Sequence, residues 1–155
     1  MNIGYLLESV LKLQIDDEIF IDGEKRRVVF LGEYSLEHYP NQSFFKLFFD
    51  DGNWLEIEPA SERCYMCNFL QHPVDRNLII DYGETLEMNG NEFRLNDAQD
   101  HQTLRKVYFG DITDGEGDGI FSAYLFAGES FVLADDDKNR DSFSKKIPLE
   151  SIRIN

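Results

Sequence analysis

Four turn signals, each lying between two runs rich in apolar residues, constrain this chain more than any other feature of its sequence. Their central residues are Asp22-Gly23, Asp51-Gly52, Asn89-Gly90 and Ala127-Gly128. The flanking runs are 18–21 and 26–31, 43–49 and 54–57, 84–88 and 92–95, and 121–126 and 130–133. Glycine adopts the positive φ that tight hairpin turns require. The sequence therefore predicts four antiparallel hairpins and a mainly β fold.

The two halves of the chain repeat this pattern, which suggests an internal duplication. Aligning Gly23 with Gly90, and Gly52 with Gly128, brings apolar positions of the two halves into register. The glycine spacing is longer in the second half by the length of the Gly- and Asp-rich stretch 111–119, which we interpret as an insertion. We expect two diverged antiparallel strand meanders, small and barrel-like, covering 15–74 and 75–155 and packed together as one compact domain. Their joint is predicted at Asp75-Arg76-Asn77, after His72-Pro73.

In the N-terminal residues 1–14, apolar side chains recur with a different period from that of the predicted strands. Apolar side chains fall at helical spacing there, at Ile3, Leu6, Leu7, Val10 and Leu11. The stretch is too short to span a bilayer, and Glu8 interrupts any signal-peptide core. We therefore expect one short helix that packs on the β units, no membrane insertion and a cytoplasmic location. Further strands are predicted at 104–109 and, at a sheet edge, 147–154, with a polar loop over 135–146 between them.

The charge excludes one class of partner and favours another. Thirty acidic residues against 15 basic ones give a net charge of −15. Such a surface repels nucleic acid and anionic membranes. Two explanations stay open: the acidity keeps the protein soluble, or it forms a docking surface for a basic protein partner. The dense run Asp135, Asp136 and Asp137 is a candidate for that surface.

The first half also resembles a known family. The residues concerned are Asp17-Glu18, Asp22-Gly23, Val28-Val29, Gly32 and the run Phe49-Asp50-Asp51-Gly52-Asn53-Trp54-Leu55. This pattern resembles the uncharacterised bacterial family catalogued as domain of unknown function 4178, over roughly residues 15–58. The resemblance implies a β-rich fold and a bacterial origin, and it assigns no activity. In the strand before the second turn, where that family carries a Trp and an acidic residue, this chain has Phe44-Phe45-Lys46.

Two motifs have a composition that could bind a metal. Cys64 and Cys67 form a single Cys-x-x-Cys pair, whereas structural zinc needs four ligands. In a strand, such residues point to opposite faces, so we expect reduced, metal-free thiols. The run Asp114, Glu116 and Asp118 places carboxylates as the start of a calcium loop does, but Leu125 stands where the bidentate Glu belongs. We interpret this run as a solvated hairpin tip, with a weak calcium site as the alternative.

These observations favour a non-enzymatic interaction or accessory protein that uses no cofactor. The chain lacks the Gly-x-Ser-x-Gly, phosphate-loop and dinucleotide motifs, and its three histidines are scattered. One alternative is an inhibitor or immunity protein whose carboxylates mimic phosphates and block a basic partner. Another is a ligand- or metal-binding module.

Overall fold

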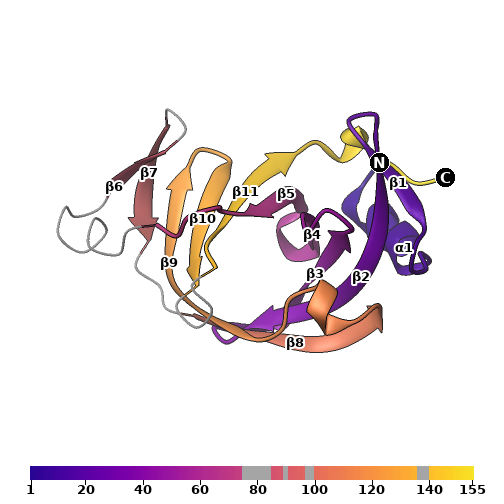
Figure 1. Ribbon diagram of the computed structural model, residues 1–155, viewed down its shortest axis with the longest axis horizontal. Helices are drawn as coiled ribbons and strands as arrows, with labels where there is room; N and C mark the ends of the chain where they lie inside the picture. The colour runs from indigo at the N-terminus through magenta and orange to yellow at the C-terminus, as the bar shows by residue number, and fades with distance from the viewer. Residues whose placement is uncertain (75–84, 89–90, 97–99, 136–139) are drawn as a thin grey trace.

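Strands dominate the part of the chain that the structure, a computed structural model, describes: residues 1–74, 85–88, 91–96, 100–135 and 140–155 (Figure 1). The chain begins with the α-helix α1 (Ile3–Leu11). The strands of the first half are β1 (Glu18–Ile21), β2 (Glu24–Leu36), β3 (Tyr39–Phe49), β4 (Trp54–Glu58) and β5 (Arg63–Phe69). Those of the second half are β6 (Thr85–Met88), β7 (Asn91–Asn96), β8 (Asp100–Phe109), β9 (Gly119–Ala127), β10 (Ser130–Asp135), β11 (Ser142–Ile147) and β12 (Ile152–Arg153). The prediction of a mainly β fold with one short N-terminal helix is confirmed.

The sheet contains two series of strands that are neighbours in chain order. Strands β1 to β5 are neighbours in chain order, and so are β6, β7, β9, β10 and β11. The two series share one curled antiparallel sheet, in which β11 pairs with β5. The additional strand β8 pairs with β2 along most of its length and with β9 at its start. Strand β8 thus bridges β2 of the first series and β9 of the second. The extra segment of the second half is therefore longer than the stretch 111–119 that we expected.

The turn glycines lie where the sequence places them. Gly23, Gly52 and Gly128 have positive φ values of 77°, 86° and 60°. They close the hairpins β1–β2, β3–β4 and β9–β10. Strands β6 and β7 also pair as a hairpin, but Asn89-Gly90 lies outside the described residues. The predicted joint at Asp75-Arg76-Asn77 lies outside them too.

The C-terminal region differs from the prediction. Residues 147–154 do not form one edge strand, because the short 3₁₀-helix η3 (Leu149–Ser151), capped by Pro148, separates β11 from β12. Strand β11 instead occupies part of the predicted polar loop. Its Ser142 and Ser144 are buried because β11 lies between β5 and β10, where neighbouring strands satisfy its backbone. The polar composition of this segment therefore misled the sequence interpretation.

Both faces of the first meander are buried, each by different elements. On one face, α1 contributes Ile3, Leu6 and Val10 to a core with β1, β12 and alternate residues of β2 to β5. On the other face lies what we call the aromatic core. Its buried members are Phe30, Tyr34, Phe48, Trp54, Tyr65, Cys67, Phe131 and Leu133, so it is shared by both halves.

The segment between β8 and β9 packs closely against β2. It contains the 3₁₀-helix η2 (Ile112–Asp114). A Cβ at Gly110, whose φ is +90°, would collide with the carbonyl oxygen of Val29, and one at Gly115 would collide with the Phe30 ring. These two glycines therefore permit the approach of this segment, which we call the plug loop (residues 110–118).

We expect Gly110→Ala to destabilise the protein more than Gly128→Ala. Both positions impose the strain of a positive φ, about 1–2 kcal/mol for a non-glycine residue. Only Gly110 adds a backbone collision, since nothing lies within 4 Å of a Cβ built at Gly128. The measurement is urea unfolding of both variants, and equal losses would contradict the close approach of the plug loop.

Candidate functional site

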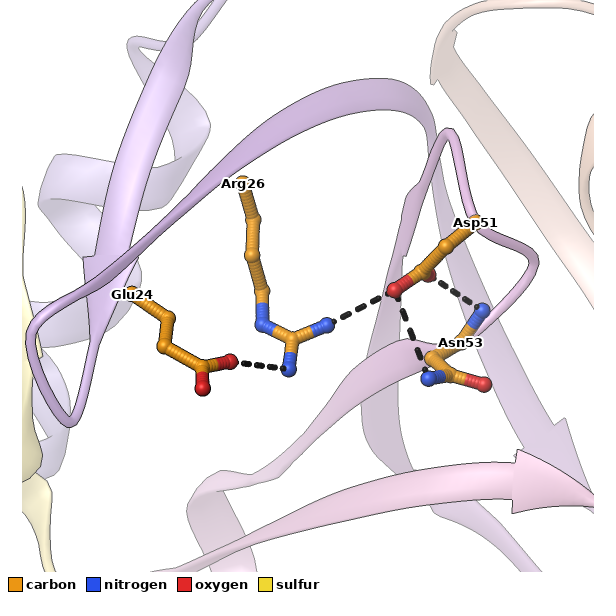
Figure 2. Close-up of polar contacts among 4 residues, drawn as sticks. All are labelled: Glu24, Arg26, Asp51 and Asn53. Atoms are coloured by element: carbon orange, nitrogen blue, oxygen red, sulfur yellow. Dashed lines mark hydrogen bonds and ion pairs between the residues drawn. The ribbon is translucent and has the colours of Figure 1, made fainter.

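The two Asp-Gly hairpins of the first half lie side by side, and an arginine joins them. Arg26 Nη1 donates to Asp51 Oδ2 at 2.9 Å, and its Nη2 lies 3.4 Å from Glu24 Oε2 (Figure 2). Asp51 also accepts a hydrogen bond from the Asn53 backbone N–H at 2.9 Å, which orders the second turn. The Arg26 side chain is only 18% exposed and lies over the Phe49 ring. Its position is therefore fixed by packing as well as by charge.

A second arginine extends this arrangement. Arg27 contacts Asp50 Oδ2 through Nε at 3.3 Å and Asp16 Oδ1 through Nη1 at 3.2 Å. Because Arg26 and Arg27 are consecutive residues of β2, their side chains point to opposite faces of the sheet. We call the exposed rim formed around them by Asp16, Asp22, Glu24, Asp50 and Asp51 the hairpin face. Each of these five residues is exposed, and two guanidinium groups orient four of the carboxylates. The hairpin face is therefore an ordered acidic surface.

A lysine lies on the inward aromatic face of β3. Residues 44, 46 and 48 share one face of this strand because side chains alternate. Lys46 is consequently buried, with 1% of its side chain exposed, and forms an ion pair with Glu116 of the plug loop. Its Nζ also donates to Gln102 Oε1 at 2.7 Å and lies 5.0 Å from the Tyr34 ring centroid and 5.5 Å from that of Trp54.

Further hydrogen bonds hold the plug loop around this ion pair. The Tyr34 hydroxyl donates to the Glu116 carbonyl oxygen, and Gln102 Nε2 donates to the Gly117 carbonyl oxygen at 3.0 Å. Burial alone lowers the pKa of Lys46, but the negative charge of its ion-pair partner Glu116 outweighs it and raises that pKa. Lys46 is therefore a charged structural cross-link, and a lysine in this state is a poor base or nucleophile.

The neighbouring titratable groups hold their protons tightly. Burial, with repulsion from Glu58, raises the pKa of the Glu56 carboxyl well above its usual range. Burial likewise raises the pKa of the Cys67 thiol, and it raises that of the Cys64 thiol to about 11. Both thiols are thus protonated at neutral pH, and the thiolate is the reactive form.

The two cysteines lie on opposite faces of β5. Cys64 belongs to the core beneath α1, whereas Cys67 belongs to the aromatic core. Both are free thiols. This arrangement follows from the alternation of side chains along the strand and does not bring the two sulfurs to one point.

The acidic run of the plug loop is not the solvated hairpin tip that we expected, because several of its carboxylates make contacts within the protein. Glu116 is buried, Asp111 accepts a hydrogen bond from the Thr113 N–H, and Asp118 accepts one from the Leu104 N–H. Asp114 is exposed. Within the described residues, no group of three or more His, Cys, Asp or Glu side chains is arranged to hold a metal ion. The loop carboxylates order the loop itself and connect it to the sheet.

The side chains of the run Asp135, Asp136 and Asp137, which we considered as a docking surface, are not described by the structure. Asp135 ends β10, but its side chain, together with Asp136 and Asp137, lies outside the described part. In that part, no helix is long and apolar enough to cross a membrane.

Sequence reasoning missed Lys46 as a central residue. The signal that could have found it is a lone charge in the run Phe44-Phe45-Lys46-Leu47-Phe48-Phe49, at a position that alternation assigns to an aromatic face. Its partners carried no such signal. Gln102 and Glu116 lie far from Lys46 in the sequence, and only the path of the plug loop brings them together.

We expect Lys46→Met to destabilise the fold by about 3–5 kcal/mol, because it leaves the Glu116 carboxylate buried without its counter-charge. The double variant Lys46→Met/Glu116→Gln should lose less than the sum of the two single variants. The measurement is a double-mutant cycle by urea unfolding. The control pair is Lys12–Glu8, whose side chains are 76% and 68% exposed, with an expected coupling below about 0.5 kcal/mol. Equal coupling in the two pairs would contradict the central role of Lys46.

We expect Glu56→Gln to change how stability depends on pH. Because its pKa is raised in the folded state, Glu56 stabilises the fold below its unfolded pKa and loses that contribution as pH rises through the folded value. A pKa difference of one unit corresponds to about 1.4 kcal/mol. The variant should therefore gain stability relative to the native protein between acidic and mildly alkaline pH. Thermal unfolding across that range tests this, with the exposed Glu150→Gln as control; parallel curves would contradict it.

Comparisons of this chain with protein-family models, with curated proteins and with solved structures find no match.

Proposed function

We propose that this protein is a non-enzymatic interaction or accessory protein that docks a basic protein partner through its hairpin face. The observation that carries the proposal is the ordered set of carboxylates around Arg26 and Arg27. Carboxylates held in place by intramolecular ion pairs lose little conformational entropy on binding, which favours association. Each retains lone pairs that a lysine or arginine of a partner can contact.

The distribution of charge supports the same proposal. Among the described residues, six lysine and arginine side chains pair with carboxylates of the chain itself: Lys12, Lys25, Arg26, Arg27, Lys46 and Lys146. These pairs neutralise equal numbers of acidic and basic groups, so the excess of 30 acidic over 15 basic residues remains and can attract a basic partner. Complementary charge of this kind steers encounter and raises the association rate more than it raises affinity.

The proposal extends to the setting of the protein. A bacterial origin is what the resemblance of the first half implies, and a cytoplasmic location is part of the same proposal. The hairpins that carry this resemblance are also those that form the hairpin face.

The test uses a partner captured from native lysate, followed by measurements of its binding kinetics. Raising salt from about 0.05 to about 0.5 M should weaken binding steeply, because screening lengths fall well below 10 Å. Asp22→Asn/Glu24→Gln should slow association several-fold and change dissociation little. The control, Glu62→Gln/Glu92→Gln, removes the same charge elsewhere on the surface. Binding that is insensitive to salt and to the first double variant would refute the proposal.

A further inference from the structure

A surface pocket of about 330 Å³ lies between the β3–β4 turn and the plug loop. Its apolar lining includes Val29, Phe48 and Phe69, and its charged lining is Arg27, Arg140, Asp50 and Asp114. This volume reaches the lower end of the range that small-molecule sites occupy. The pocket therefore combines aromatic rings with two guanidinium groups and two carboxylates.

Arg140 is held in an unusual environment for so acidic a protein. Its Cζ lies 3.8 Å from the centroid of the Phe69 ring, so the guanidinium packs directly on that ring. Phe69 in turn packs against Trp54 at 4.7 Å between centroids, and Trp54 stacks on Phe48 at 4.9 Å. Among the described residues, no carboxylate forms an ion pair with Arg140. The Arg140 charge, which no carboxylate in the described part of the chain pairs with, is thus placed on an aromatic stack at the pocket.

The remaining lining supplies further polar groups. Arg27 uses Nε for Asp50 and Nη1 for Asp16, and within the described part its Nη2 has no recorded partner. The Thr113 backbone N–H is bound by Asp111, which orders the plug loop where it borders the pocket. Gly115 also borders the pocket, and any side chain there would collide with the Phe30 ring. The guanidinium groups of Arg27 and Arg140, which both line the pocket, can therefore donate hydrogen bonds at this site.

We propose that this pocket binds a small anion that carries a planar ring, with a carboxylate or phosphate as its charged group. Guanidinium groups bind both of these anions through paired hydrogen bonds. They also stack on flat rings, and the aromatic lining adds apolar contact for the same part of the ligand. The site lies beside the hairpin face and is a function beyond partner docking.

The net charge of the protein does not preclude such a ligand. The charge of −15 repels anions at long range, but physiological salt screens exposed charges beyond about 8 Å. Inside the pocket, the closest charges decide the interaction. Two carboxylates line the pocket together with the two arginines. Asp50 is paired with Arg27, whereas Asp114 forms no ion pair with Arg140 within the described residues, so the Arg140 guanidinium is available to an anion beside one opposing carboxylate.

The test is calorimetric titration of the full chain with phenyl phosphate and with benzoate. The single tryptophan, Trp54, gives an independent fluorescence signal because it packs against two rings of the pocket. Benzyl alcohol and inorganic phosphate serve as comparison probes that lack the charge or the ring. We expect at least one ring-bearing anion to bind at least about tenfold more tightly than either comparison probe.

Arg140→Ala should weaken binding by about tenfold or more, and Arg140→Lys should give an intermediate loss because the planar group is removed while the charge stays. The matched control is Arg153→Ala, which removes an arginine packed over Phe20 at 4.5 Å and away from the pocket. Unchanged thermal unfolding of Arg140→Ala separates lost binding from lost folding. The proposal would be overturned if neither ring-bearing anion bound, or if benzyl alcohol or inorganic phosphate bound as tightly as the ring-bearing anions. It would also be overturned if Arg140→Ala and Arg153→Ala lost the same affinity. Partner docking should not respond to Arg140→Ala, so the two proposals can fail separately.

Discussion

The buried ion pair between Lys46 and Glu116 is the interaction on which the rest of the structure depends. A lysine ammonium within an aromatic core is tolerable only if a counter-charge and hydrogen-bond acceptors reach it. Glu116 and Gln102 meet that need, and both belong to the segment that runs from β8 to β9. Neutralising Lys46 therefore requires the plug loop to lie against β2, where β8 bridges β2 and β9 of the curled sheet.

The polar groups of the interior and those of the surface have different roles in this protein. Inside, the counter-charge of Glu116 keeps Lys46 protonated, and burial keeps the Cys67 thiol protonated. These buried polar groups therefore serve the fold. Outside, the β3–β4 turn contributes to both proposed binding regions. Asp50 belongs to the hairpin face and also lines the pocket, whose opposite wall is the plug loop. The loop that neutralises the core thus also shapes the surface.

Some elements of the fold could be predicted from the sequence and others could not. The hairpins at Gly23, Gly52 and Gly128 were predictable because a positive φ is a local requirement that glycine meets at low cost. Strand β11 was not predictable, since Ser142 and Ser144 carry no apolar pattern and are strand residues only because β5 and β10 flank them. The plug loop was mistaken for a solvated tip for the same reason: the environment of Glu116 depends on a distant lysine.

The sequence by itself determined the turn positions, the alternation that places Cys64 and Cys67 on opposite faces, the N-terminal helix and the acidic charge. Each of these depends on a residue and its near neighbours or on simple composition. Tertiary structure alone decided the burial of Lys46 with Glu116, the stacking of Arg140 on Phe69 and the joining of two hairpins by Arg26. These contacts join residues that are distant along the chain, and their partners are selected by how the sheet curls, which no local pattern encodes.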